Sequence, residues 1–246
     1  MSALLFLLLA FVSEIAGTIA GFGSSVFFVP LAGFFFDFHE VLALTAILHV
    51  FSNAAKLVLF RHAVQWRLLL LLGIPSTLFV ILGAYLSTRL EFKYTELILG
   101  IFLIAFSTFF LIRPKTKLSP HPFNAVAAGG AAGFLAGVIG TGGAIRGLAL
   151  GAFDLEKNMF VATSAAIDSG VDLSRMIVYL RSGFLTAESF WLIPALFAIA
   201  FAGSYTGKLL LNKIEQKSFR KIVLVLVLLI GLTTLYEFVR HIMSHG

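Results

Sequence analysis

The chain has 246 residues, of which 59% are hydrophobic and only 12% are charged, and its mean hydropathy is +1.01. A soluble domain carries about 25% charged residues, so the composition excludes an ordinary soluble globular protein. The net charge of +6 does not indicate nucleic-acid binding, because basic loops are the usual cytoplasmic anchors of membrane proteins. There is no cysteine, so the sequence indicates no redox compartment and no Cys-based metal site.

The first apolar segment covers residues 3–36 and contains the glycine-rich stretch GFGSS. It is longer than the roughly 20 residues of a simple membrane span, and glycine allows the backbone to leave helical geometry. We therefore expect a segment that is broken at glycine. It has no basic n-region and no clear cleavage site, so we interpret it as part of the mature fold rather than as a signal peptide.

Each half of the chain contains one glycine-broken segment, one helix with several polar residues and two apolar spans. In the first half these elements are 3–36, the helix from Leu42, 66–88 and 94–112. In the second half, after a polar linker at 113–123, they are 124–153, the helix from Val161, 190–211 and 222–236. The order of elements is therefore the same in both halves.

Polar and proline residues also recur between the halves, at a constant offset of 119 positions. The matched pairs are Thr45 and Ser164, His49 and Asp168, Asn53 and Asp172, Lys56 and Arg175, and Pro75 and Pro194. Polar matches at one spacing, together with the paired glycine-rich segments, indicate an internal repeat. We therefore predict transmembrane repeats at 1–112 and 124–246, joined by the 113–123 linker.

The distribution of Lys and Arg distinguishes two topologies. If each broken segment crosses the membrane once, the basic residues divide almost equally between the two sides. If each segment re-enters and returns, or crosses twice, most of them gather on the side of the linker. The second topology places the linker in the cytoplasm and both termini outside. The predicted fold class is thus an all-α polytopic membrane protein with two inverted-topology repeats, an architecture typical of secondary transporters.

The two glycine breaks are the first candidates for a binding site. A half-helix that begins inside the membrane directs free backbone N–H groups and the positive end of its dipole toward the centre, which suits an anion. The residues assigned to this cradle are Gly23, Ser24, Ser25, Gly140, Thr141, Gly142 and Gly143. The alternative is that the glycines only allow close helix packing. A nucleotide phosphate loop is excluded, because its G-K-[ST] ending is missing.

Ionisable residues within the spans are the second group, because charges at membrane depth are costly and mark functional sites. Two sets have i, i+4, i+7 spacing, which places each set on one helix face. These are His49, Asn53 and Lys56 in the first half, and Asp168, Asp172 and Arg175 in the second. Substrate binding is assigned to Asn53, Lys56, Arg175 and Arg146, the last of which follows the second glycine break. The alternatives are ion pairing of the aspartates with Arg146 or Arg175, and extension of Lys56 to the membrane interface.

Four residues are candidates for proton coupling or charge pairing: Glu14, His49, Asp168 and Asp172. Glu14 lies in the first broken segment, and His is the side chain whose charge changes near neutral pH. The alternatives are an interfacial position for Glu14 and simple hydrogen bonding for His49. No metal is predicted, because no His pair within the spans has i, i+4 ligand spacing with a carboxylate.

Three stretches carry a resemblance to a known family: GTIAGFGSSVFFVP at 17–30, GFLAGVIGTGGA at 133–144 and VATSAA at 161–166. The chain resembles the sulfite exporter permeases of the TauE/SafE type over nearly its whole length. The resemblance implies export of a small sulfur-containing anion, such as sulfite, thiosulfate or an organosulfonate, across a bacterial inner membrane. The sequence departs from the family pattern in its reduced first glycine cluster and in the AIRGLA continuation of the second.

Together these features predict a secondary transporter of a small sulfur-containing anion, which works by alternating access at the midplane between the two repeats. Two alternatives stay open: a passive anion channel on the same fold, and a permease for another small organic or inorganic anion. No enzymatic activity and no cofactor is predicted, because neither a nucleophile–base pair nor a metal set is found. The expected partners are the anion and the lipid bilayer, without nucleic acid, and the oligomeric state is left open.

Overall fold

The computed structural model of the protein shows an all-helical chain in its described part. The described residues are 2–21, 23–61, 64–89, 92–113, 121–140, 142–143, 146–147, 150, 155–213, 215, 221, 224–225, 228–229, 231–236 and 238–239. Their elements are the α-helices α1 (Ser2–Ala20), α2 (Ser25–Ala32), α3 (Phe38–Leu59), α4 (Trp66–Leu68), α5 (Ile74–Ser87), α6 (Phe92–Ile112), α7 (Pro122–Ile139), α9 (Lys157–Arg181) and α10 (Leu192–Leu211), the π-turn η1 (Leu69–Gly73) and the 3-10 turn η2 (Ala187–Ser189). No strand occurs among these residues, which confirms the all-α class.

Five helices of the described part are long and apolar enough to cross a bilayer. They are Ala3–Ala20, Phe38–Leu59, Trp66–Ser87, Pro122–Ile139 and Leu192–Leu211. Each has 18 to 22 residues, which at about 1.5 Å per residue matches a hydrocarbon core of about 30 Å. The protein is therefore a polytopic membrane protein. The predicted spans at 66–88, 94–112 and 190–211 coincide with helices, whereas the span at 222–236 lies only partly within the described residues.

The first glycine-broken segment turns back inside the bundle. α1 is followed by Gly21 and Gly23, whose φ angles of 77° and 90° are left-handed and favour glycine. α2 has only eight residues, so it is about 12 Å long and does not cross the bilayer. The ring of Phe6, near the start of α1, packs 5.4 Å from that of Phe28 and 4.9 Å from that of Phe36. α2 therefore runs back toward the end at which α1 begins.

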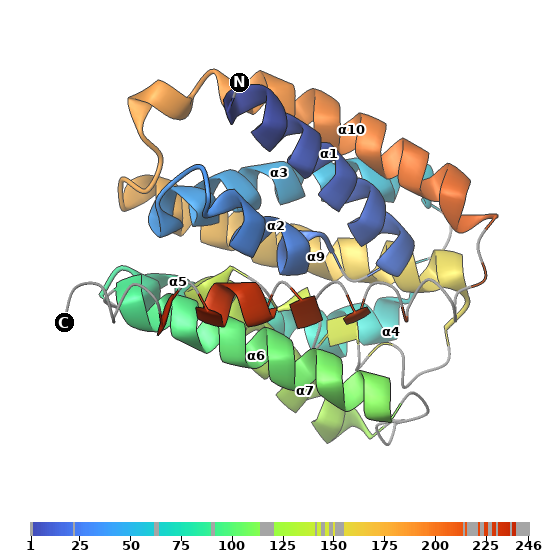
Figure 1. The fold of residues 1–246 in the computed structure, drawn as a ribbon. Helices are drawn as coiled ribbons and strands as arrows, with labels where there is room; N and C mark the ends of the chain where they lie inside the picture. Colours follow the sequence, from blue (N-terminus) through green and yellow to red (C-terminus); the bar gives the residue numbers. More distant parts are fainter. Residues whose placement is uncertain are drawn as a thin grey trace.

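α1 and α10 lie side by side and run in the same direction, as the upper part of Figure 1 shows. Gly203 of α10 faces Glu14, and Gly207 faces Thr18 one turn further along both helices. A methyl group at either glycine would lie 2.7 Å from a Cβ atom of α1. The two backbones therefore approach each other more closely than helices with larger interface side chains can.

α7 packs against η1 and α5 in the same manner and also in parallel. Gly129 faces Leu72, and Gly137 faces Val80 two turns further along. A methyl group at Gly129 would lie 2.5 Å from the carbonyl oxygen of Leu72. Each half of the protein thus contributes the long helix of its glycine-broken segment to a close pair with a helix of the other half.

α3 and α9 lie between these two pairs and run antiparallel (Figure 1). At one end, the Thr186 hydroxyl, which follows α9, donates to Oε1 of Glu40 near the start of α3 at 2.6 Å. At the other end, the backbone N–H of Gln65, which follows α3, donates to Oγ1 of Thr163 near the start of α9 at 2.9 Å. α9 carries several charged residues, and its central position covers them with protein.

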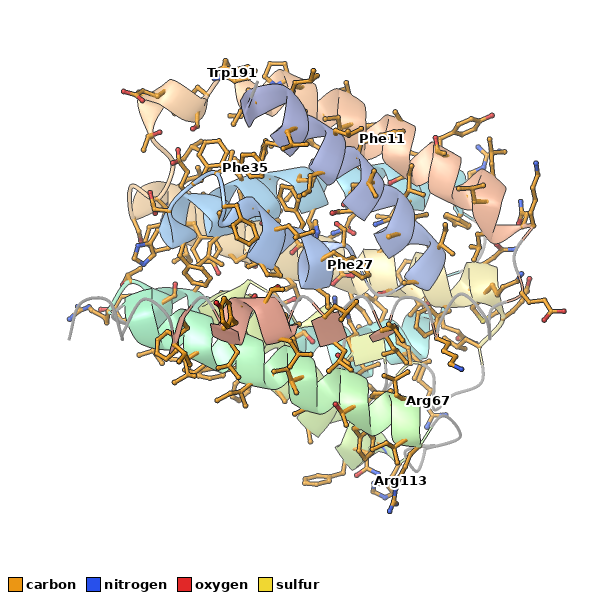
Figure 2. All side chains as sticks on the ribbon, in the orientation of Figure 1. Phe11, Phe27, Phe35, Arg67, Arg113 and Trp191 are labelled. Carbon is orange, nitrogen blue, oxygen red and sulfur yellow. The ribbon has the colours of Figure 1, made fainter. Side chains whose placement is uncertain are left out.

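Basic residues gather where α3 and α10 end and α9 begins. Nζ of Lys208 in α10 donates to the carbonyl of Leu59 in α3 at 2.7 Å. Nζ of Lys157 in α9 lies 3.4 Å from the carbonyl of Leu211 in α10. Arg67 and Arg113 lie toward the same side of Figure 2, and Trp191 lies toward the other side. This is the grouping that the topology with returning segments requires.

The contacts between helix ends give the direction of each helix. α1, α3 and α10 run in one direction. α9 is antiparallel to α3, and the end of α5 meets the start of α3 through His39 and Ser87, so α5, α7 and α9 run in the other. α7, α9 and α10 are the predicted counterparts of α1, α3 and α5, and each runs opposite to its counterpart. These directions support the predicted inverted repeat; the duplication itself stays a prediction.

Candidate anion site between the two halves

The predicted polar faces of α3 and α9 meet in the interior. Nδ2 of Asn53 donates to Oδ2 of Asp172 at 2.7 Å, and Oδ1 of Asp172 pairs with Nη2 of Arg175 at 2.7 Å. Nδ1 of His49 lies 3.6 Å from Oδ2 of the same aspartate. None of these four residues is more than 6% exposed. The i, i+3 salt bridge considered from the sequence is therefore formed, and it belongs to a network that joins both halves.

Arg175 connects this network to the second glycine break. Its Nη1 donates to the carbonyl of Gly140 at 2.8 Å and lies 3.3 Å from that of Ala136. Gly140 ends α7 with a φ of 76°, so the cation lies at the negative end of the helix dipole, where it is stabilised. Nη2 of Arg175 is 3.3 Å from Nδ1 of His49. Since a guanidinium can only donate, Nδ1 accepts in this arrangement and Nε2 carries the proton.

Ser24, at the first glycine break, connects His49 to Glu14. Its hydroxyl oxygen lies 2.8 Å from Nε2 of His49, and its hydroxyl donates to Oε1 of Glu14. Ser52 donates to Oε2 of Glu14, and Nζ of Lys56 lies 3.5 Å from the same oxygen. Glu14 is fully buried rather than interfacial. A continuous chain of hydrogen bonds therefore runs from Arg175 through His49 and Ser24 to Glu14.

Arg146 is the least satisfied charge of the site. It is only 3% exposed, and its Nη2 forms an ion pair with Oδ1 of Asp168. Oδ2 of Asp168 accepts from Ser164 at 3.2 Å. Within the described part of the chain, Nε and Nη1 of Arg146 are buried and have no hydrogen-bond partner. Buried donors without a partner are costly, so these two nitrogens indicate a place for an acceptor.

Two small cavities lie next to each other beside these groups. The first has room for about one water molecule, about 10 Å³, and is lined by Gly23, Ser25, His49, Ala136, Gly140, Gly142, Gly143, Arg146, Asp168, Val171, Asp172 and Arg175. The second is of the same size and is lined by Gly17, Gly21, Gly23, Asn53, Lys56, Val161, Ser164, Ala165 and Asp168. Gly23 and Asp168 line both, so the two cavities share part of their wall.

A family model described as Sulfite exporter TauE/SafE matches residues 5–234, nearly the whole chain. The chain belongs to the TauE/SafE sulfite exporter family. Searches of curated proteins and of solved structures found no match. Family membership confirms the resemblance read from the glycine-rich stretches and agrees with the membrane-spanning helices.

In this TauE/SafE member, most of the predicted site residues come together. Seven candidates for substrate binding line the first cavity: Gly23, Ser25, Gly140, Gly142, Gly143, Arg146 and Arg175. Asn53 and Lys56 line the second cavity instead. Ser24 is not among the lining residues of either, because its hydroxyl is engaged by Glu14 and His49. Thr141 lies outside the described residues.

Two polar residues of the site were not singled out from the sequence. Ser52 donates to Glu14, and its position three residues after His49 and four before Lys56 could have indicated the shared helix face. Tyr179 is fully buried, and its hydroxyl donates to the carbonyl of Gly137 at the end of α7; no sequence signal indicates this contact. No group of His, Asp or Glu among the described residues has the arrangement of a metal site.

Proposed function

We propose that the protein is a secondary transporter of a small sulfur-containing anion, which binds between the two halves and is moved by alternating access. The observation that carries this proposal is Arg146, a buried guanidinium that lines the first cavity and has two nitrogens without a hydrogen-bond partner among the described residues. Charge-assisted hydrogen bonds from such a group to an oxyanion are strong, and its planar fork matches two oxygens at once. Family membership supports a sulfur oxyanion or sulfonate as the ligand.

The backbone around Arg146 suits an anion with several oxygens. Gly23, Gly140, Gly142 and Gly143 line the cavity without side chains, so a ligand can approach the main chain closely. Ser25 and His49 add polar groups to the same lining. A few convergent polar groups are what fixes the orientation of a ligand in a small-molecule pocket.

The cavity accepts about one water molecule, which is less than a sulfite ion with four heavy atoms requires. Binding therefore needs the helices to separate or the Arg146–Asp168 ion pair to open. Alternating access provides such a movement, because one bundle of helices rocks against the other around a fixed central site. We propose that the basic end of the bundle, with the 113–123 linker, faces the cytoplasm, and that both termini face outward from the inner membrane.

The direct test is anion flux in proteoliposomes, with labelled sulfite, thiosulfate and methanesulfonate as probes. Replacing Arg146→Gln should lower flux about tenfold to a hundredfold, because hydrogen bonds to a charged group contribute roughly 1.5–3 kcal/mol. Arg67→Gln, an exposed arginine at the basic end, is the matched control. Unchanged flux of all three probes in the Arg146 variant would refute the binding role.

Arg146→Gln also leaves Asp168 without its partner, so loss of flux could reflect loss of folding. The double variant Arg146→Gln/Asp168→Asn removes both charges and avoids a lone buried carboxylate. It should keep its elution profile in detergent and still fail to transport. Flux that no ion gradient can drive uphill, together with single-channel currents, would indicate a passive anion channel instead.

A further inference from the structure

Asp168 already engages part of the guanidinium of Arg146 that a bound anion would use. A guanidinium offers two edges for bidentate binding, one between Nε and Nη2 and one between Nη1 and Nη2. The nitrogen common to both edges, Nη2, is paired with Asp168. The nitrogens without a partner in the described chain, Nε and Nη1, are the outer members of the two edges. Each edge uses one of the two hydrogens of Nη2, so Asp168 takes a donor from one edge and places its negative charge beside an oxyanion bound at the other.

The charges of the site are balanced before any ligand binds. Three buried cations each pair with one buried anion: Lys56 with Glu14, Arg146 with Asp168 and Arg175 with Asp172. An added anion gives the cluster a net negative charge in a medium of low dielectric constant, which is costly. One proton taken up by a carboxylate would restore the balance.

Asp168 is the carboxylate best placed to take that proton. Glu14 accepts from two serine hydroxyls and lies near Lys56, and Asp172 is held by Asn53 and Arg175. Asp168 has Arg146 and Ser164 as its partners, and it would lose Arg146 to the arriving anion. A protonated Asp168 can still hydrogen-bond with the Ser164 hydroxyl, because both groups can donate and accept.

The charged and titratable groups on the helices around Asp168 agree with this assignment. The charged or titratable groups that act on it are Arg146, Asp172 on its own helix, and His49 and Lys56 of α3. α5 and α7, which also pack on α9, contain no Asp, Glu, Lys, Arg or His. No second acid therefore stands on those two helices to accept the proton in its place.

We propose that Asp168 is an internal competitor of the transported anion and carries one proton with it. The carboxylate of Asp168 leaves Nη2 of Arg146 and takes up one proton from the aqueous solution. The oxygens of the anion then accept hydrogen bonds from the freed N–H groups of Arg146. On release the proton leaves, and the ion pair forms again. Because Asp168 lines both cavities, its departure from Arg146 changes the wall that they share. This inference rests on the proposed transport function.

The test uses thiosulfate and methanesulfonate, whose own protonation does not change in the neutral range. Binding to the purified full-length protein should tighten about tenfold for each pH unit of acidification over the range where Asp168 titrates, since one proton is bound with each anion. A pH indicator in weak buffer should report this proton uptake in the wild-type protein. Asp168→Asn should bind the probes at least as tightly as the wild type, without the pH dependence.

Flux measurements show whether transport is coupled to protons, which binding measurements alone do not. With Asp168→Asn, a proton gradient should no longer drive accumulation, whereas exchange of internal for external anion should continue. Glu40→Gln is the matched control, because Glu40 is an equally buried carboxylate near the start of α3 that is bonded to Thr186; it should retain coupling.

The outcomes distinguish this inference from the proposed function. Binding that is independent of pH in the wild type, or an Asp168→Asn variant with unchanged proton uptake, would overturn the inference and leave an uncoupled transporter. Weaker binding in Asp168→Asn would also overturn it, because a competitor cannot contribute to affinity. Absence of binding and flux of every probe in the wild type would overturn the proposed function itself.

Discussion

The amide of Asn53 donates a 2.7 Å hydrogen bond to the carboxylate of Asp172, which lies 119 positions further along the chain. This separation equals the offset of the predicted repeat, so the two residues are each other's predicted counterparts. In a two-fold arrangement, an element meets its own counterpart only where the axis passes between them. The axis of the predicted repeat would therefore pass between α3 and α9, at the level of the candidate site.

This relationship predicts that Asn53→Asp is strongly destabilising. The substitution places a second carboxylate against Asp172, where the amide now donates a hydrogen bond. An uncompensated buried charge costs about 3–5 kcal/mol. Thermal unfolding in detergent measures the effect, and Asn212→Asp at the exposed end of α10 is the control. Equal melting temperatures for Asn53→Asp and the wild type would contradict the contact.

A pair of neighbouring glycines in α7 tests the close packing on η1 and α5. A methyl group at Gly129 would lie 2.5 Å from the carbonyl oxygen of Leu72, whereas one at Gly130 meets only the Phe79 ring, at 3.5 Å. Gly130→Ala should stabilise the protein by up to about 1 kcal/mol through helix propensity. Gly129→Ala should destabilise it by about 1–3 kcal/mol through overpacking. Denaturation in the same detergent compares the two, and equal effects would argue against the proximity of α7 and η1.

Ser24→Ala tests the hydrogen-bonded chain between Glu14 and His49. The variant leaves the fully buried Glu14 with one donor fewer and Nε2 of His49 without its acceptor. A buried group without a partner costs about 1–3 kcal/mol, so the free energy of unfolding should fall by that amount. Among the described residues, the Ser87 hydroxyl bonds to the carbonyl of Ala84 on its own helix, so Ser87→Ala should have a smaller effect. A larger effect at Ser87 than at Ser24 would count against the chain.

Cysteine labelling tests the orientation, and the absence of native cysteine makes it clean. Arg67→Cys and Glu188→Cys both lie at exposed positions, near opposite ends of the bundle. In intact cells, an impermeant maleimide should label position 188 and should reach position 67 only after permeabilisation. Labelling of both positions from one side would remove the basis for the returning first segment and the cytoplasmic linker.

Arg146→Lys separates charge from geometry. Lysine retains the positive charge but lacks the planar fork that binds two oxygens. Binding of thiosulfate should weaken about tenfold, and less than in Arg146→Gln. Isothermal titration provides the comparison; a lysine variant that binds as tightly as the wild type would show that charge alone suffices.

The sequence was sufficient to predict the membrane class, the two glycine breaks and the polar faces of α3 and α9. These features depend on hydropathy, glycine content and helical periodicity, which are local along the chain. The pairing of Arg146 with Asp168 was foreseen as one alternative, because a buried charge needs a nearby partner. The helix that contains the charges, α9, could be placed in the interior for the same reason.

The partners of His49 and Ser24 could not be predicted. They depend on which side-chain conformations fit when α2, α3 and α9 pack together, and residues far apart in the sequence decide this. The assignment of Ser24 to a substrate cradle rested on the dipole of a half-helix, whereas Glu14 engages the Ser24 hydroxyl. The role of Arg175 at the carbonyl of Gly140 likewise requires the second break to lie beside α9.

The glycines that bring α10 onto α1, and α7 onto α5, have a mechanical consequence. Two helices in backbone contact have no layer of flexible side chains between them along which they could slide. We expect each of these helix pairs to move as one rigid body. Relative motion is then expected at interfaces filled by long polar side chains, such as the interface between α3 and α9. The moving interface would thus contain the buried charges, so the groups that bind the anion would also hold the moving parts together.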